Sequence, residues 1–280
     1  MKLSSQVIEK ILLLTAFSAV SILALITFFI FNEGLPLIFK AGLFKFIFGK
    51  IWDPSHHIFS ILPMILGSIY VTAGALALGV PLALSCAIFL TEFSSPRISA
   101  ILKPTIELLA GIPSVIYGFI GVIILTPLIR TYLGGPGSSI LAASIVLSVM
   151  ILPTVISISI DAILAVPKSY KEGSLALGAN LWQTVRMVIL PAARSGILAG
   201  VILGMGRAVG ETMAVIMVAG NALKIPTSVL DPVRTLTSNI ALELGYAVGD
   251  HRMALFATGV VLFIFVMLLN ILARVVVKHE

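Results

Sequence analysis

The chain has 280 residues, of which 59% are hydrophobic and only 11% are charged. About a quarter of the residues of an ordinary soluble domain are charged, so this composition excludes a soluble fold and indicates one polytopic membrane domain, 1–280. The net charge of +6 is spread over the loops without interleaved aromatic residues, which excludes nucleic acid as a partner and leaves membrane lipid as the main surroundings.

Apolar runs long enough to cross a membrane follow one another along the chain. About 20 apolar residues cross ~30 Å of hydrocarbon, and backbone groups in lipid must be paired internally, so each run is expected to be a helix. The expected spans are 11–31, 61–90, 106–129, 138–160, 196–220 and 254–273. The first run is too long for the apolar region of a signal peptide, so we expect it to be retained. The predicted fold class is all-α, with six transmembrane helices.

The charges of the loops indicate an orientation. Lysine and arginine are slightly more frequent on the side of the N-terminus, and the bias grows if the long loops 32–60 and 221–253 are set aside. We therefore expect both termini to lie in the cytoplasm. His56 and His57, in an outer loop, have no further ligands at suitable spacing, so we expect no metal site.

The inner loop 161–195 is expected to carry structure of its own. Ser169 followed by Glu172 forms a capping box, which predicts the start of a short helix, and Gly178 can supply its left-handed end. Asn180 begins a second start signal with the glutamine three residues later.

A second short helix is therefore predicted, and Pro191 is expected to end it. Two short helices joined by a tight turn would form a knob suited to docking into another protein. The alternative is a helix pair that lies in water or on the lipid surface.

The same loop resembles the EAA loop of ABC importer permeases, whose pattern is E-A-A-x3-G-x9-I-x-L-P. The matching positions are Glu172, Gly178, Leu190 and Pro191. The departures are Gly173 and Ser174 in place of the two alanines and Val188 in place of isoleucine. These exchanges are between small or apolar residues, so the turn and the helix ends are kept.

Two further stretches narrow the resemblance. Residues 111–119 read G-I-P-S-V-I-Y-G-F, and residues 207–215 read R-A-V-G-E-T-M-A-V, with A-G-N at 219–221. Together they resemble the PstC-type permeases of phosphate-specific ABC importers over essentially the whole chain. The resemblance implies a type I ABC importer permease fold in the inner membrane of a prokaryotic cell.

The resemblance also implies partners. These would be a homologous PstA-type permease, two copies of a PstB-type ATPase that binds ATP and Mg²⁺, and a soluble PstS-type phosphate-binding protein. The residues implied in coupling to the ATPase are Ser169, Glu172, Gly173, Ser174, Gly178, Leu190 and Pro191. Because the chain has no G-x-x-x-x-G-K-[ST] loop, we expect it to be a permease without a cofactor, and not an enzyme.

Two charged residues stand inside an expected span, Arg207 and Glu211. Arg207 would lie about 16 Å beyond Gly196 at ~1.5 Å per residue, near the middle of the bilayer, where a charge is costly. Glu211 is four residues further on the same expected helix face, where an ion pair can form. A ridge of Gly196, Gly200 and Gly204 would let another helix approach, with Arg207 pointing into the bundle.

These two residues are the expected substrate path. A planar guanidinium can hold two phosphate oxygens at once, and Glu211 would keep the empty guanidinium in place. The resemblance associates the matching arginine and glutamate with phosphate passage. Three alternatives stay open: an ion pair that only fixes helix register, another oxyanion such as sulfate, molybdate or phosphonate, and an anion transporter that works without ATP.

Overall fold

The structure is a computed structural model that describes residues 5–278, so the predicted domain 1–280 extends beyond it at both ends. Most of the described residues are helical, and among them there are isolated β-bridges but no strand, which confirms the all-α prediction. The helices are α1 (Ser5–Ala41), α2 (Leu43–Phe48), α3 (Leu62–Ile88), α4 (Pro96–Ala110), α5 (Ser114–Ile120), α6 (Thr126–Tyr132), α7 (Ile140–Leu164), α8 (Lys168–Ala176), α9 (Leu181–Thr184), α10 (Leu190–Gly210), α11 (Met213–Val218), α12 (Leu236–Glu243) and α13 (Gly249–Lys278). A 3-10 turn, η1 (Pro54–His56), and three π-helical turns, η2 (Phe89–Phe93), η3 (Gly121–Leu125) and η4 (Val185–Ile189), complete them.

In the described part of the chain, six helical segments are long and apolar enough to cross a membrane. They are Val7–Ala41, Leu62–Phe93, Ser114–Tyr132, Ile140–Leu164, Leu181–Gly210 and Gly249–Ile271. Each overlaps one expected span, so the six-span prediction is confirmed. The bounds of the first, third and fifth differ most: the first is longer than the expected 11–31, and the differences in the third and fifth bear on the site.

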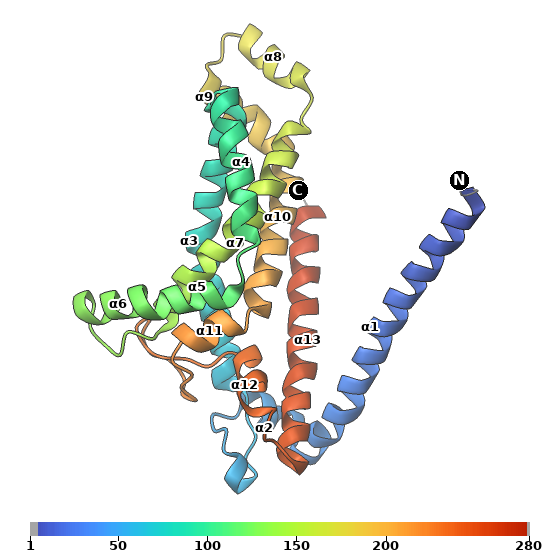
Figure 1. The fold of residues 1–280 in the computed structure, drawn as a ribbon, viewed down its shortest axis with the longest axis vertical. Helices are drawn as coiled ribbons and strands as arrows, with labels where there is room; N and C mark the ends of the chain where they lie inside the picture. The colour runs from blue at the N-terminus through green and yellow to red at the C-terminus, as the bar shows by residue number, and fades with distance from the viewer. Residues whose placement is uncertain (1–4, 279–280) are drawn as a thin grey trace.

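The third expected span, 106–129, is not one helix. α4 ends at Ala110, and α5 begins only at Ser114. Pro113 has no N–H to donate and disfavours a helical conformation at Ile112, so the helix cannot continue through this point. Figure 1 shows α5 and α6 lying crosswise to α4 and α7.

The fifth expected span, 196–220, is shifted toward the N-terminus. A helical rod runs from Leu181 through η4 to Gly210, so the expectation that Pro191 ends the second short helix is wrong. Pro191 falls in the first turn of α10, just after the π-helical turn, where a missing N–H breaks no regular bond. After a short break at 211–212, the chain continues as α11.

α7 forms the centre of the bundle and packs against α3 and α10. The glycine ridge of α10 faces it. A Cβ added to Gly196 would lie 2.5 Å from Ala162 Cβ, and one added to Gly204 would lie 2.7 Å from Val155 Cγ2. The prediction that this ridge lets another helix approach closely is therefore confirmed.

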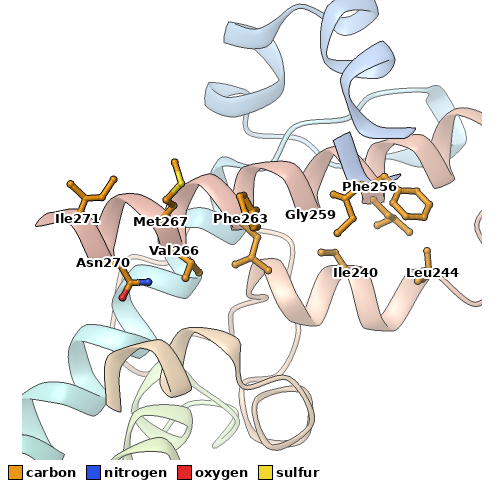
Figure 2. Close-up of a pocket in the computed structure, with 12 residues that line it drawn as sticks. Ile240, Leu244, Phe256, Gly259, Phe263, Val266, Met267, Asn270 and Ile271 are labelled. Carbon is orange, nitrogen blue, oxygen red and sulfur yellow. The ribbon is translucent and has the colours of Figure 1, made fainter. Parts of the chain in front are cut away.

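α1 packs against α13 near its own C-terminal end. Gly34 lets the two backbones touch there, since an added Cβ would lie 2.8 Å from Ala257 N. The rest of α1 leans away from the bundle (Figure 1). This leaves an apolar groove of about 830 Å³ along α13, beside α12, in which Phe263 and Met267 lie near the polar Asn270 (Figure 2).

The two ends of the bundle carry different elements. α8 stands at one end, toward which the start of α1 and the end of α13 also point, and α2 and η1 stand at the other (Figure 1). We call these the α8 end and the α2 end. A chain that crosses the membrane an even number of times begins and ends on the same side, and the start of α1 and the end of α13 do point the same way (Figure 1).

Candidate functional site

Arg207 lies in the last turn of α10. The sequence placed it in the interior of a span that ran on to residue 220, but the helix stops at Gly210. α10 ends part-way along α13, between the two ends of the bundle (Figure 1), so its last turn is not at either end. Its side chain is half-buried, and Nη1 donates to Thr154 Oγ1 of α7 at 3.4 Å. The side chain therefore points into the bundle, as predicted.

The guanidinium of Arg207 has few partners. It carries five N–H donors, and among the described residues it makes a single hydrogen bond, the 3.4 Å contact with Thr154, which is long. A half-buried cation at this depth is costly unless its donors are paired. Most of its donors are thus left for water or for an anion.

Glu211 stands outside α10, in extended backbone at the helix break. Its Oε1 accepts a hydrogen bond from Ala214 N at 3.1 Å, which caps the start of α11. In the described part of the chain no ion pair joins Glu211 to Arg207. The predicted i,i+4 pair is therefore wrong, because the two residues do not share one helix.

Arg207 lies between a packed and an open side of α10. Tyr117 of α5 is near enough for its phenol to interact with the charge of the guanidinium. The Tyr117 hydroxyl donates to Leu109 O at 2.8 Å, across the break between α4 and α5. On the open side, a Cβ added to Gly206 or Gly210 would meet no atom within 4 Å. This chain therefore leaves space next to Arg207.

The short helices that follow the two breaks pack together beside this space. A Cβ added to Gly118 in α5 would lie 2.9 Å from Ala214 Cα in α11. At the start of α12, Thr237 Oγ1 donates to Glu211 O at 3.2 Å, so a carbonyl freed by the second break is bonded. α5, α11 and α12 thus meet around the candidate site.

α8 and the turn after it confirm part of the predicted knob. Pro167, not Ser169, is the N-cap of α8, and no side chain caps this end, so the first predicted capping box is wrong. Gly178 has φ +87°, which confirms the left-handed end. Asn180 and Gln183 form a capping box with both hydrogen bonds at 2.8 Å, as predicted.

One side of α8 is open. Glu172 is exposed, a Cβ added to Gly173 would meet no atom within 4 Å, and Leu177 is 91% exposed. On the other side, Ser174 Oγ lies 3.0 Å from Oγ1 of the buried Thr184. This side of α8 is therefore accessible from outside the chain.

The predicted coupling residues fall in two places along the chain. Those in α8 and the turn that follows it are Ser169, Glu172, Gly173, Ser174 and Gly178. Those in the first turn of α10 are Leu190 and Pro191. η4 separates the two groups, and from the first group Glu172 and Gly173 lie on the exposed side of α8 whereas Ser174 faces Thr184.

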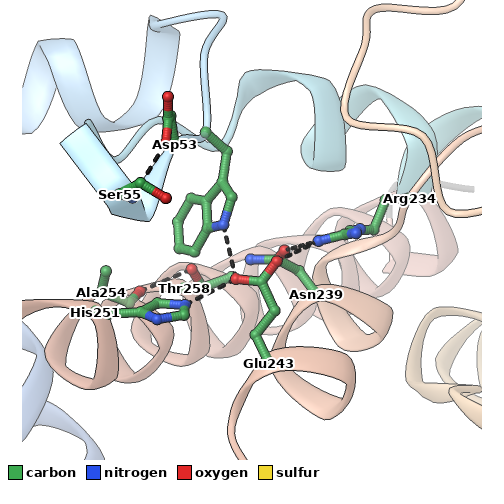
Figure 3. A network of polar contacts seen from close by, with 9 residues as sticks. Asp53, Ser55, Arg234, Asn239, Glu243, His251, Ala254 and Thr258 are labelled. Carbon is green, nitrogen blue, oxygen red and sulfur yellow. Dashed lines mark hydrogen bonds and ion pairs between the residues drawn. The ribbon is translucent and has the colours of Figure 1, made fainter. Parts of the chain in front are cut away.

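At the α2 end, Glu243 is the centre of a buried polar network (Figure 3). Its carboxylate accepts from Trp52 Nε1 at 2.8 Å and from Arg234 Nη1 at 2.5 Å, and it lies 2.8 Å from His251 Nε2. Arg234 Nη1 also donates to Asn239 Oδ1 at 3.0 Å. Only 8% of the Glu243 side chain and 14% of the Arg234 side chain are exposed. The network ties α12 and α13 to the loop after α2.

Residues 79–279, from α3 to α13, match the family model described as "Binding-protein-dependent transport system inner membrane component". The match includes α8 and both helix breaks. The chain belongs to this family. It is therefore a multi-pass membrane protein and a permease component of a transport system.

Relatives extend the match over most of the chain. The probable ABC transporter permease protein YqgH of Bacillus subtilis is 43% identical, covering 89% of this chain and 84% of the relative. The phosphate transport system permease protein PstC of Mesorhizobium japonicum is 37% identical, covering 82% and 77%. The probable phosphate transport system permease protein PstC of Methanocaldococcus jannaschii is 33% identical, covering 96% and 93%.

Solved structures share the fold. A bacterial ABC transporter involved in the import of alginate matches with a TM-score of 0.64 at 16% identity, covering 98% of both chains. The MetNI methionine ABC transporter, in an inward-facing conformation, matches with a TM-score of 0.63 at 20% identity, covering 82% of this chain and 99% of that one. The predicted ABC importer permease fold is confirmed.

The sequence did not predict the neighbours of Arg207 or the network that joins Arg234 to Glu243. Thr154 and Tyr117 lie in apolar runs and look like ordinary span residues, so nothing in the sequence linked them to Arg207. Trp52 and Glu243 are 191 residues apart, and no spacing rule connects them. The break before α5 did have a signal, the G-I-P-S run at 111–114.

Proposed function

We propose that this chain is one of two membrane-spanning subunits of an ATP-driven importer, and that it passes inorganic phosphate across a prokaryotic inner membrane. In this proposal the α8 end, with both termini, lies in the cytoplasm, and the α2 end faces outward. Several relatives are named phosphate transport system permease proteins, which supports phosphate over other oxyanions.

The under-satisfied guanidinium of Arg207 carries the proposal. Phosphate bears one to two negative charges near neutral pH, and a planar guanidinium can donate to two of its oxygens at once. The single long bond to Thr154 leaves those donors available. The open space at Gly206 and Gly210 gives an oxyanion access to them. The side chain thus has both the charge and the free donors that a passing anion needs.

Glu211 is assigned a different role from the one its spacing indicated. Its carboxylate caps α11 and so fixes the backbone at the break next to Arg207. A negative charge close to the path also opposes tight retention of an anion, because like charges repel. We therefore assign Glu211 to shaping the site and to release.

The open surfaces of the chain are assigned to partners. A second, homologous permease subunit would cover the open side of α10, so that the path runs between the two subunits. One of two ATPase subunits, with ATP and Mg²⁺, would dock on α8 through the side that carries Glu172, Gly173 and Leu177, and the other would dock on the homologous permease subunit. A soluble phosphate-binding protein would deliver its cargo at the α2 end, and hydrolysis of ATP would belong to the ATPase.

Phosphate uptake into proteoliposomes that contain the assembled importer tests the role of Arg207. Arg207→Ala is expected to lower uptake about 100-fold, because the anion loses its charged partner. Arg252→Ala is the matched control, since that arginine stacks on Phe256 at the α2 end, and uptake should persist. Undiminished uptake in Arg207→Ala with normal assembly would overturn the assignment.

Competition and partner omission test the rest of the proposal. Unlabelled phosphate should compete with labelled phosphate, whereas sulfate, molybdate and phosphonate should not. Uptake should stop when the ATPase or the binding protein is left out. Uptake by the purified chain alone under an ion gradient would instead establish a transporter that works without ATP.

A further inference from the structure

One ion pair joins α8 to the membrane-spanning part of the chain. Lys171 Nζ lies 2.6 Å from Glu92 Oε2. Glu92 belongs to η2, the π-helical turn that ends α3 at the α8 end, and its side chain is 8% exposed. The Lys171 side chain is 38% exposed. A carboxylate withdrawn from water therefore depends on a cation supplied by α8.

The two sides of α8 have different surroundings. Lys171 and Ser174 are three residues apart, so they lie on the same side of the helix. Lys171 contacts α3 through Glu92, and Ser174 contacts Thr184 in the rod that continues as α10. Glu172 and Gly173, which follow Lys171, are exposed, and a Cβ added to Gly173 would meet no atom within 4 Å. α8 is thus joined to the end of α3 through Lys171 and to the rod of α10 through Ser174.

The end of α3 that carries Glu92 is tied to α4. Leu90 O accepts hydrogen bonds from Ser94 Oγ at 3.0 Å and from Ser99 Oγ at 2.8 Å. Ser94 follows η2, and Ser99 lies in the first turn of α4. The two helices therefore share an acceptor at their junction. A displacement of Glu92 moves the end of α3 together with the start of α4.

α4 leads from this junction to the candidate site. Its last turn accepts the Tyr117 hydroxyl at Leu109 O, and Tyr117 is near enough to Arg207 for its phenol to interact with the charge of the guanidinium. We propose that the ion pair between Lys171 and Glu92 transmits the displacement of α8 by the ATPase to α3 and α4. Both are positioning residues and touch no substrate. This inference rests on the proposed function, because it requires an ATPase bound to α8.

The test measures the number of phosphate ions taken up per ATP hydrolysed by the reconstituted importer. Lys171→Met and Glu92→Gln are each expected to lower this ratio about fivefold while ATP hydrolysis continues. The double exchange Lys171→Glu with Glu92→Lys should regain at least half of the ratio. An unchanged ratio in both single variants, or a double exchange as impaired as they are, would overturn the proposal.

A matched control separates this role from a general effect of charge. Arg97→Met removes an exposed cation from the first turn of α4, at the same end of the molecule, and should leave the ratio unchanged.

If Lys171→Met or Glu92→Gln fails to assemble, Lys171→Arg and Glu92→Asp replace them. Lys171→Arg should keep the ratio, and Glu92→Asp, which shortens the reach of the carboxylate, should lower it. The reverse result would overturn the proposal.

The experiment distinguishes failure of this inference from failure of the proposed function. The wild-type importer is first supplied with phosphate, sulfate and molybdate. If phosphate is not carried, the cargo assignment fails, and the ratio is then measured with the oxyanion that is carried. If phosphate is carried and the ratio does not respond to the ion pair, the inference fails by itself.

Discussion

Arg207 and Arg234 are arginines of one chain in opposite situations. Arg234 donates to Asn221 O, to Asn239 Oδ1 and to the carboxylate of Glu243. Arg207 makes one long hydrogen bond among the described residues. The comparison teaches that an arginine whose donors are paired within its own chain holds the fold together, whereas an arginine with spare donors is available to a partner from outside. The predictions below concern this difference.

The largest loss of stability is expected from Glu243→Ala. The change leaves Arg234 buried without a counter-charge and Trp52 without an acceptor, which costs about 3–5 kcal/mol. The apparent melting temperature of the purified chain in detergent measures the loss. Glu107→Ala removes an exposed carboxylate and should change it little. Equal effects of the two substitutions would mean that the network is not structural.

Trp52→Phe should have a smaller effect at the same network. It keeps an aromatic ring against Phe59, whose centroid is 5.6 Å away, and removes only the N–H that donates to Glu243. A hydrogen bond to a charged group contributes about 2 kcal/mol. Trp182→Phe, at a 55% exposed position, is the control in the same melting experiment. A greater loss from the control would contradict this account of the network.

Arg207→Ala should change stability by less than about 1 kcal/mol, although it is expected to lower uptake about 100-fold. The substitution removes a cation that is costly to bury and breaks only one weak contact. The melting temperature is again the measurement. A loss as large as that of Glu243→Ala would show that Arg207 is a structural residue, and the contrast between the two arginines would disappear.

The smallest effect is expected at Asp231, in the loop before α12. The backbone hydrogen bond from Thr227 N, at 2.8 Å, with further bonds from the Thr227 hydroxyl and Ser228 N, holds the pKa of Asp231 below its usual range. A depressed pKa means that this stabilisation is complete above about pH 4 and is lost as the pH falls through the lowered value.

Hydrogen exchange of the peptide 226–231 tests this expectation. Asp231→Asn should speed exchange of the Thr227 and Ser228 amides at neutral pH, because a neutral amide accepts less strongly than a carboxylate. In the wild type, protection of these amides should decrease as the pH falls, and in the variant it should not change with pH in this way. Equal protection in both proteins at neutral pH would contradict the assignment.

Much of the fold could be predicted from local patterns. The number of spans follows from hydropathy, because a backbone in lipid must pair its polar groups internally and the apolar runs are too long and uniform for the strands of a barrel. The ridge that begins at Gly196 and the capping box at Asn180 are signals of spacing within one helix, and both were correct. Each depends on residues that are neighbours in sequence.

The site was predicted less well for a physical reason. The expected ion pair assumed that Arg207 and Glu211 share a helix, but the helix ends at Gly210, between them. The hydrogen-bond acceptor of Arg207 comes from α7 instead. The pair of Lys171 with Glu92 joins residues 79 apart, and no periodicity reports such a contact. Tertiary packing, which places α7, α5 and α3, supplies these partners.

The two helix breaks, at 111–113 and 211–212, also determine which flank of the molecule faces the lipid. Backbone groups released from a helix find no partner among acyl chains, so a broken helix is tolerated only against protein or a watery cavity. The flank formed by α5 and α11 must therefore turn inward, away from the lipid. The lipid-facing side of the molecule is then the opposite flank, where α1 is a long apolar helix without a break.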